Sequence, residues 1–257
     1  MSLFDTGIIP TINDYIQSEA DKQRDYGDYW SASSAGYCMR KNIFERLRVP
    51  YTTEDARKQR VFSAGDIFHE WVQRITKNAG LSITQEHELQ DEQFMIRGHI
   101  DDLITIDGHL ILYDYKTQHS KWFEYVKDKP MSYYHRMQLG TYLYMLRSDT
   151  AKDTFDVAEA RRLAISKDDL RLYEHQLLWS KELEDEVTTY WRKLNIAWDL
   201  YNELAKLPDC TCADHEINKK TGLGFMADPK YNPFWYNGSP CSLDWFEKYK
   251  QEGKING

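Results

Sequence analysis

The stretch Phe94–Lys116, FMIRGHIDDLITIDGHLILYDYK, decides how this chain folds. Two runs rich in Ile, Leu and Tyr flank Asp107-Gly108, a dipeptide that favours a two-residue β-hairpin turn. The pattern predicts strands over Phe94–Ile106 and Leu110–Lys116, in a register where the numbers of opposite residues sum to 215. That register places Asp101 opposite Asp114, with Cβ atoms about 4.5–5.5 Å apart.

Two carboxylates that face each other destabilise a hairpin unless a cation offsets their repulsion. Mg²⁺ or Mn²⁺ is the natural candidate, because these ions prefer carboxylate oxygens. Lys116 lies two residues after Asp114 and shares its face of the strand, whereas Asp102 points to the other face. Asp, Asp and Lys on one face suit metal-assisted phosphodiester hydrolysis, in which carboxylates hold the metal and the amine orients or activates water.

The rest of the chain alternates between helical and extended patterns. Helices are expected over residues 11–24, from Ser33 or Ser34 to Leu47, and over 55–78, 120–128, 132–147 and 180–206; further strands are expected over 81–89, 161–166 and 171–178. This order indicates an α/β fold with a mixed central sheet, and not a doubly wound nucleotide-binding fold. From Pro208 onward the chain is rich in Gly, Pro and Asn, which predicts a loop-rich segment.

Composition and charge exclude several classes of protein. The 257 residues carry 33 Lys and Arg against 41 Asp and Glu, a net charge of −8. This balance argues against a protein that coats nucleic acid or an anionic membrane, and it leaves room only for a local basic groove. The chain shows neither a signal-peptide pattern nor an apolar run long enough for a membrane helix, so we expect an intracellular, cytoplasmic protein that does not bind membranes.

The hairpin residues resemble a known family. Gly98-His99-Ile100-Asp101 followed by Asp114-Tyr115-Lys116 is similar to the Gly-x-x-Asp … Asp/Glu-x-Lys signature of the PD-(D/E)XK nuclease superfamily. Three more motifs resemble the branch that contains the RecB and AddB nuclease domains and the CRISPR-associated Cas-four exonucleases. They are, in the family's order, Ser33–Arg40 (SSAGYCMR), Gly65–Glu70 (GDIFHE) and Gln138–Tyr142 (QLGTY).

The resemblance implies a restriction-endonuclease-like core, with a mixed central sheet flanked by helices. It divides the chain into an N-terminal helical extension (1–30), a nuclease domain (31–206) and a loop-rich, cysteine-bearing C-terminal cap (207–257). The cap is expected to pack back on the N-terminal part.

The resemblance also implies the site residues. The metal ligands would be His69, Asp101, Asp114 and the backbone carbonyl of Tyr115; the catalytic residues would be Asp101, Asp114, Lys116, Gln138 and Tyr142. Gln138 and Tyr142 lie four residues apart on one helical face, so both point toward one place. Taken alone, His69 could equally be a half-buried structural histidine, and Tyr142 an ordinary core residue.

The four cysteines are Cys38, Cys210, Cys212 and Cys241. One early and three late cysteines resemble the iron–sulfur members of this branch, which implies a [4Fe-4S] cluster with four thiolate ligands. The long gap between Cys212 and Cys241 departs from the family. A structural zinc site with four cysteines, or with His215 as a substitute ligand, and unligated thiols are the alternatives.

The sequence therefore predicts a metal-dependent exonuclease that acts on single-stranded DNA or DNA ends, in recombination, repair, phage or CRISPR-type DNA processing. The alternatives are a structure-selective endonuclease of the same fold, and a non-catalytic DNA-end-binding subunit of a recombination complex. The chain has no Gly-x-x-x-x-Gly-Lys-Ser/Thr loop, so a helicase or recombinase would come from another chain. The oligomeric state is left open.

DNA itself is expected to bind in a narrow groove. The expected phosphate contacts are Arg40, Lys41 and Arg136, with Arg97 and Lys121 as further candidates and Trp122 and Tyr134 as stacking partners for bases.

Overall fold

The structure is a computed structural model that describes residues 8–20, 27–50, 56–148, 155–212, 232–234, 236–237 and 239–255. Its elements are α1 (Ile8–Ala20), β1 (Trp30–Ser31), the short 3₁₀ helix η2 (Ala32–Ser34), α2 (Met39–Arg46), α3 (Ala56–Asn78), β2 (Ser82–Asp91), β3 (Ile96–Ile106), β4 (His109–Gln118), α4 (Ser120–Val126), α5 (Tyr133–Arg147), β5 (Glu159–Ser166), β6 (Leu172–Leu178), α6 (Lys181–Leu204) and α7 (Leu243–Gln251).

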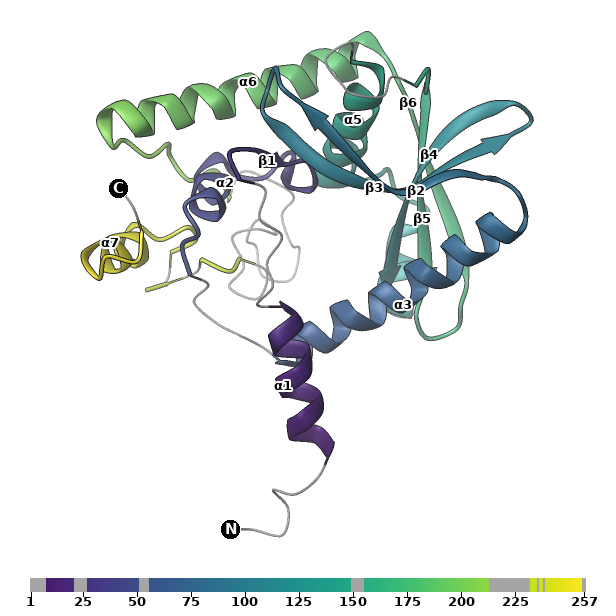
Figure 1. Ribbon diagram of the computed structural model, residues 1–257, viewed down its shortest axis with the longest axis horizontal. Helices are drawn as coiled ribbons and strands as arrows, with labels where there is room; N and C mark the ends of the chain where they lie inside the picture. Colours follow the sequence, from purple (N-terminus) through teal and green to yellow (C-terminus); the bar gives the residue numbers. More distant parts are fainter. Residues whose placement is uncertain are drawn as a thin grey trace.

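Six strands form one mixed sheet (Figure 1). The path runs β1-β3-β4-β5-β6, and β2 also pairs with β3. The pairs β2–β3, β3–β4 and β5–β6 are antiparallel, whereas β1–β3 and β4–β5 are parallel. The α/β fold with a mixed sheet flanked by helices is confirmed.

The predicted hairpin turn and register are also confirmed. Asp107 and Gly108 have φ values of 52° and 79°, the two positive angles that a type I′ turn requires. The β3–β4 ladder runs from the turn to Asp102 opposite Tyr113, in the register where residue numbers sum to 215.

The ladder stops one step before the two carboxylates, so Asp101 and Asp114 are not a paired couple across the hairpin. Instead, Oδ2 of Asp101 accepts a hydrogen bond from the backbone N–H of Tyr115 at 2.7 Å. The carboxylate of Asp101 thus serves as the acceptor for a strand N–H at the point where the ladder ends. The prediction of directly opposed carboxylates is wrong in this respect.

Helices cover both faces of the sheet (Figure 1). Phe68, Trp71 and Val72 of α3 pack on one face, in a cluster with Ile104, Ile111, Tyr113, Tyr115, Leu163 and Ile165. On the other face α5 and α6 build the main core, whose fully buried members include Leu103, Leu112, Met137, Leu143 and Trp191. Burying large apolar side chains on both sides fixes the sheet between two helical layers.

Most predicted elements are confirmed to within a few residues, but the helix expected from Ser33 or Ser34 to Leu47 is broken. Only the turn η2 and the short helix α2 form there. The break lies at Gly36, which has a φ of +81° and sits so close to α5 that a Cβ would lie 3.0 Å from the ring of Tyr133 and 3.1 Å from Met137. The chain therefore turns before Cys38, the N-cap residue of α2.

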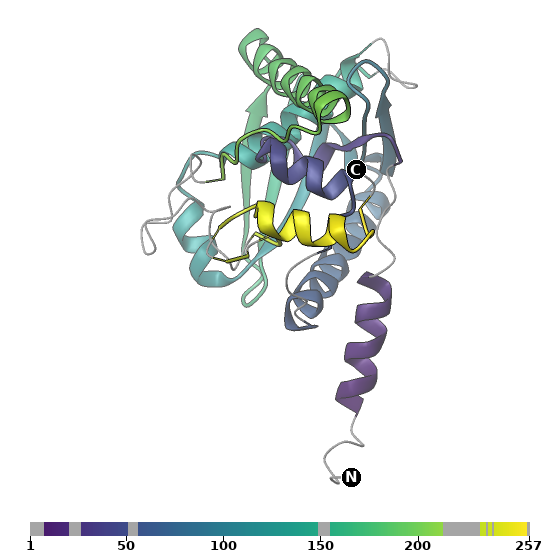
Figure 2. The same ribbon diagram turned by 90° about the vertical axis from the view of Figure 1, so that its left-hand side faces the viewer.

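At the ends of the chain, two helices differ from expectation. Helix α1 begins at Ile8 rather than at residue 11, and residues 21–24 of the predicted helix lie outside the described residues. Helix α7 was not predicted; Ser242 caps it by accepting a hydrogen bond from Trp245 N at 3.4 Å. Figure 2 shows α7 beside α2, where Phe246 stacks on Phe44 with ring centroids 5.1 Å apart. No helix of the described residues is long and apolar enough to cross a bilayer.

Candidate active site

The edge of β3 that faces β4 pairs with two different strands. Its start pairs with β1, where Ser31 lies opposite Arg97, and its end pairs with β4 from Asp102 onward. In the described ladders, Gly98–Asp101 pair with neither strand on this edge. The gap between β1 and β4 along this edge leaves Asp101 at an opening in the sheet, and the predicted site residues gather around it.

Asp114 is the most buried charged group at this opening, with 3% of its surface exposed. Its Oδ1 accepts hydrogen bonds from Lys116 Nζ at 2.7 Å and from Gln138 Nε2 at 3.2 Å. Its Oδ2 is buried and has no hydrogen-bond partner among the described residues. A buried carboxylate oxygen without a partner is costly, so this atom fits a ligand of a divalent cation.

Asp101 and His69 form the other side of the opening. Oδ2 of Asp101 lies 3.7 Å from Nδ1 of His69, which α3 supplies. Burial raises the pKa of Asp101 to about 7; the nearby Lys116 opposes this rise and Asp114 adds to it. Burial, followed by the charge of Lys116, lowers the pKa of His69. Neutral imidazole is the form of histidine that binds metals, so this pair also fits a cation site.

Tyr115 takes part through its backbone N–H, which binds Asp101, and through its ring, which is fully buried and lies edge-on to His69. Ligation by its carbonyl stays a prediction.

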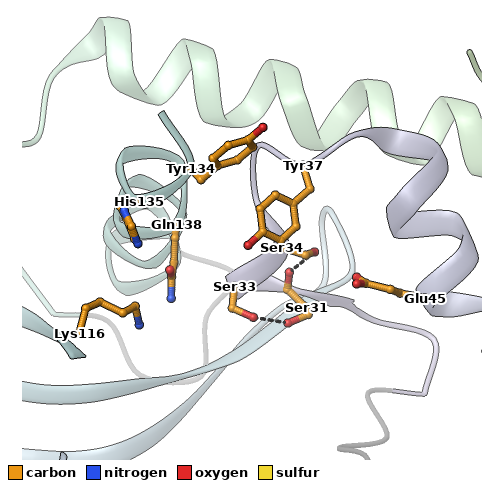
Figure 3. Close-up of a pocket in the computed structure, with 9 residues that line it drawn as sticks. All are labelled: Ser31, Ser33, Ser34, Tyr37, Glu45, Lys116, Tyr134, His135 and Gln138. Carbon is orange, nitrogen blue, oxygen red and sulfur yellow. Dashed lines mark hydrogen bonds between the residues drawn. The ribbon is translucent and has the colours of Figure 1, made fainter. Parts of the chain in front are cut away.

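A cavity of about 320 Å³ borders this opening (Figure 3). It is lined by Ser31, Ser33, Ser34, Tyr37, Glu45, Lys116, Tyr134, His135 and Gln138. Figure 3 shows Lys116 and Gln138 facing the hydroxyls of Ser31 and Ser33, which lie 2.8 Å from each other. One wall is therefore cationic and amide-bearing, and the other presents hydroxyl groups and the carboxylate of Glu45.

Tyr142, predicted as a catalytic residue, lies in the core with 5% of its surface exposed. Its ring packs on Gly98, where an added Cβ would come within 2.9 Å of the ring and 2.8 Å of Ala32. Only glycine allows this approach. Tyr142 thus packs against β3 at Gly98, in the stretch that pairs with β2 but with neither β1 nor β4, whereas Gln138 from the same helix reaches Asp114.

Asp102 confirms its predicted orientation away from the site, but its role was not anticipated. Its carboxylate is fully buried and accepts hydrogen bonds from Thr76 Oγ1, Ser82 Oγ, Gln85 Nε2 and the hydroxyl of Tyr115, at 2.6 to 3.1 Å. It joins α3 and β2 to the hairpin. No sequence motif marks this network, because its members come from four separate elements.

Arg162 is a second residue that the sequence did not reveal. It lies beside Asp114 in the parallel β4–β5 register and is 6% exposed. Its Nε has no hydrogen-bond partner among the described residues. Burial lowers the pKa of its guanidinium, and the charge of Asp114 opposes that effect. Arg162 thus adds a buried positive charge beside Asp114.

The three cations predicted to bind DNA have partners within the protein. Arg40 Nε donates to the carbonyl of Pro208 at 2.7 Å, and Lys41 is buried beside Glu45 and over the ring of Tyr37. Arg136 forms an ion pair with Glu186. These contacts favour structural roles for Arg40 and Lys41, and DNA binding by the three residues stays a prediction.

Two aromatic side chains on α4 are exposed instead. Trp122 and Tyr125 have 51% and 46% of their surface exposed, and their ring centroids lie 5.0 Å apart. Lys129 Nζ lies over the ring of Tyr125. This group has the features of a surface on which bases stack.

The four cysteines come together, as predicted. Cys38 Sγ lies 3.9 Å from Cys210 Sγ, Cys212 Sγ lies 3.5 Å from Cys241 Sγ, and all four sulfurs lie within 4.8 Å of one another. His215, the possible substitute ligand, lies outside the described residues. The four thiols form a site that could hold a metal ion.

The chain as a whole is similar to several solved structures. One is SSO0001, with a TM-score of 0.46 and 18% identity; the match covers 79% of this chain and 89% of that one. They also include LHK-Exo in complex with dAMP, with a TM-score of 0.47 and 18% identity over 71% and 96% of the two chains. An alkaline exonuclease (LHK-Exo) from Laribacter hongkongensis has a TM-score of 0.43 and 13% identity; the match covers 69% of this chain and 93% of that one.

No curated protein matches the sequence. The sequence model described as "PD-(D/E)XK nuclease superfamily" matches residues 36–212, which is more than half of the chain. The matched region holds the hairpin with Asp101, Asp114 and Lys116, together with His69 and Gln138. The closer resemblance to the RecB, AddB and Cas-four branch stays a prediction. The chain belongs to the PD-(D/E)XK nuclease superfamily.

Proposed function

We propose that this protein is a Mg²⁺- or Mn²⁺-dependent deoxyribonuclease, an exonuclease that acts on single-stranded DNA or on DNA ends. The observation that carries the proposal is the state of Asp114. One of its oxygens is bound to Lys116 and Gln138, and the other is buried with no hydrogen-bond partner among the described residues. The charge of Asp114 also acts on Asp101 and His69, which lie 3.7 Å apart. Membership of a nuclease superfamily supports the same conclusion.

His69, Asp101, Asp114 and the carbonyl of Tyr115 would hold the divalent cation. When bound, such a cation polarises a phosphate oxygen and makes a bound water more acidic. Oδ2 of Asp114, which has no hydrogen-bond partner in the part of the chain that the structure describes, and the neutral imidazole of His69 suit this ion.

Lys116 acts as an ammonium ion in this proposal. Burial disfavours its charged form, but the carboxylates of Asp114 and Asp101 outweigh burial, so the pKa of Lys116 is raised. A lysine that keeps its proton donates hydrogen bonds. It can therefore orient the attacking water and stabilise negative charge on the phosphate, while Gln138 holds Asp114 in position.

The cavity beside Lys116 supports action on single strands or ends. Its volume of about 320 Å³ lies at the lower limit of ordinary ligand pockets, about 300–1,000 Å³. Hydroxyls such as those of Ser31 and Ser33 are common phosphate ligands. A flexible strand can place one nucleotide in such a space more easily than a duplex can. We place the activity in recombination, repair, phage or CRISPR-type DNA processing, with a helicase or recombinase supplied by another chain.

The test compares end-labelled linear and circular single-stranded DNA, each with Mg²⁺ or Mn²⁺. We expect the linear strand to be shortened from an end and the circle to stay intact. Cleavage of the circle would instead indicate a structure-selective endonuclease. Binding to ends without cleavage in either metal would indicate a non-catalytic end-binding subunit.

A further inference from the structure

The four cysteine thiols are too close together for the cluster that the family resemblance implies. All six sulfur pairs lie within 4.8 Å, with two contacts of 3.5 and 3.9 Å. In a [4Fe-4S] cluster each thiolate binds a different iron at the corner of a cube, which sets the outer sulfurs on the order of 6 Å apart. A cluster would have to push every pair of these thiols outward.

The same distances match a single tetrahedral ion. Zn–S bonds of about 2.3 Å at tetrahedral angles place the sulfurs roughly 3.8 Å apart. The Cys38–Cys210 and Cys212–Cys241 contacts lie on either side of this value. Four sulfur ligands with no open position are typical of structural zinc sites.

The surroundings of the thiols suit thiolate ligands. The backbone N–H of Thr211 donates to Cys38 Sγ at 3.4 Å. The side-chain amide of Asn232 donates to Cys212 Sγ at 3.5 Å and to Cys241 Sγ at 3.6 Å. Four thiolates around Zn²⁺ carry a net charge of −2, and N–H donors aimed at the sulfurs offset that charge.

From this geometry we infer that Cys38, Cys210, Cys212 and Cys241 form a mononuclear structural zinc site. The ion joins the start of α2 to the two parts of the C-terminal segment, residues 210–212 and 241. Binding is a ligand substitution without electron transfer, in which Zn²⁺ displaces the thiol protons into solvent.

The zinc site also fixes one wall of the cavity, and this consequence rests on the proposed nuclease function. Cys38 directly follows Tyr37, and Tyr37 with Ser31 and Ser33 forms the hydroxyl-bearing wall opposite Lys116. Tyr190 holds the same loop by donating to the carbonyl of Tyr37 at 2.9 Å. Loss of zinc should therefore loosen this wall and weaken DNA binding, while the carboxylate site stays assembled.

The experiment measures metals in the full chain. The protein is expressed with added iron and cysteine and purified without oxygen, so that an iron–sulfur cluster would survive. We expect about one zinc per chain, no sulfide and a colourless solution. Replacement of zinc by Co²⁺ should give the intense visible bands of a tetrahedral tetrathiolate complex. Four irons with four sulfides and a brown colour, or four reactive thiols that bind neither zinc nor Co²⁺, would overturn the inference.

Three variants sharpen the result. Asn232→Ala removes a donor without removing a ligand, and it should release zinc to a chelator several-fold faster than the wild type. Asp114→Asn should keep the full zinc content, because it lies in the other site. If Asp114→Asn and the wild type both hold one zinc but neither cleaves DNA, the nuclease proposal fails and the zinc inference stands. If the wild type cleaves DNA but holds no zinc, the zinc inference fails and the nuclease proposal stands. Cys38→Ser should lose zinc, and its Co²⁺ spectrum should change even if it folds poorly.

Discussion

Lys116 Nζ lies 2.7 Å from Asp114 Oδ1, while the second oxygen of that carboxylate is buried without a partner among the described residues. The lysine thus neutralises one half of the carboxylate and leaves the other half for a ligand. Both residues come from β4, two positions apart, and the strand geometry alone puts them on one face.

Asp102→Asn should destabilise the protein without abolishing cleavage by the molecules that remain folded. Its carboxylate accepts four hydrogen bonds within a buried network. Losing the charge from such a network costs on the order of 2 kcal/mol in the free energy of unfolding. Urea denaturation and the activity per folded molecule check both parts. Loss of metal binding in this variant would mean that Asp102 belongs to the active site.

Because Asp102 is structural, it makes a poor charge control for the active site. Asp107→Asn is the better one, since Asp107 is exposed in the hairpin turn and Asn-Gly forms the same turn.

Tyr142→Phe should keep cleavage, because it retains the ring that packs on Gly98. Tyr142→Ala should lose about 3–5 kcal/mol of stability, since it leaves a cavity in the core. Thermal melting of both variants, with cleavage measured below their transitions, tests this account. A stable Tyr142→Phe variant that cannot cleave would assign the hydroxyl a catalytic role.

Trp122→Ala should weaken single-stranded DNA binding by roughly 1–3 kcal/mol if its ring stacks on a base. Its exposed side chain contributes little to the core, so the melting temperature should stay close to that of the wild type. Fluorescence anisotropy with a labelled strand measures the affinity, and Leu170→Ala, at another exposed apolar residue, serves as the control. Equal affinities for Trp122→Ala and the wild type would show that Trp122 does not contact the DNA.

The stability of the protein should fall in mild acid partly because of His135. Burial, followed by the charges of Arg162, Lys116 and His175, lowers the pKa of His135 well below its usual value. As the pH falls through about 6.5, the unfolded chain takes up this proton while the folded chain resists it, so the free energy of unfolding decreases. Urea melts at about pH 7.5 and 5.5 should show a smaller decrease for His135→Gln than for the wild type. An identical decrease would exclude His135 as its source.

The sequence predicts the parts of the fold that depend on local chemistry. Asp107-Gly108 sets the turn and register, and the alternation along β4 places Asp114 and Lys116 together. The motif around His69 predicts a site residue that the structure indeed brings to Asp101.

What the sequence cannot supply depends on contacts between distant elements. Helix propensity alone does not reveal the break before Cys38, because Gly36 is forced by the approach of Tyr133 and Met137. The β3–β4 ladder ends at Asp102, and the same edge of β3 pairs at Ile96 and Arg97 with β1, a strand far away in the sequence. The partners of Arg40 lie in the C-terminal segment, so its role could not be inferred from its neighbours.

The central claim is tested by metal-binding calorimetry and single-turnover cleavage on Asp114→Asn and Lys116→Ala, with Asp107→Asn as the control. Asp114→Asn removes the carboxylate that offers its free oxygen to the cation, so Mg²⁺ or Mn²⁺ affinity and cleavage should both be lost while the protein stays folded. Lys116→Ala should still bind the metal, but cleavage should fall roughly 10²–10⁴-fold, because the water loses its partner. Near-wild-type cleavage by Asp114→Asn, or loss of metal binding by Lys116→Ala with Asp114 intact, would contradict the account.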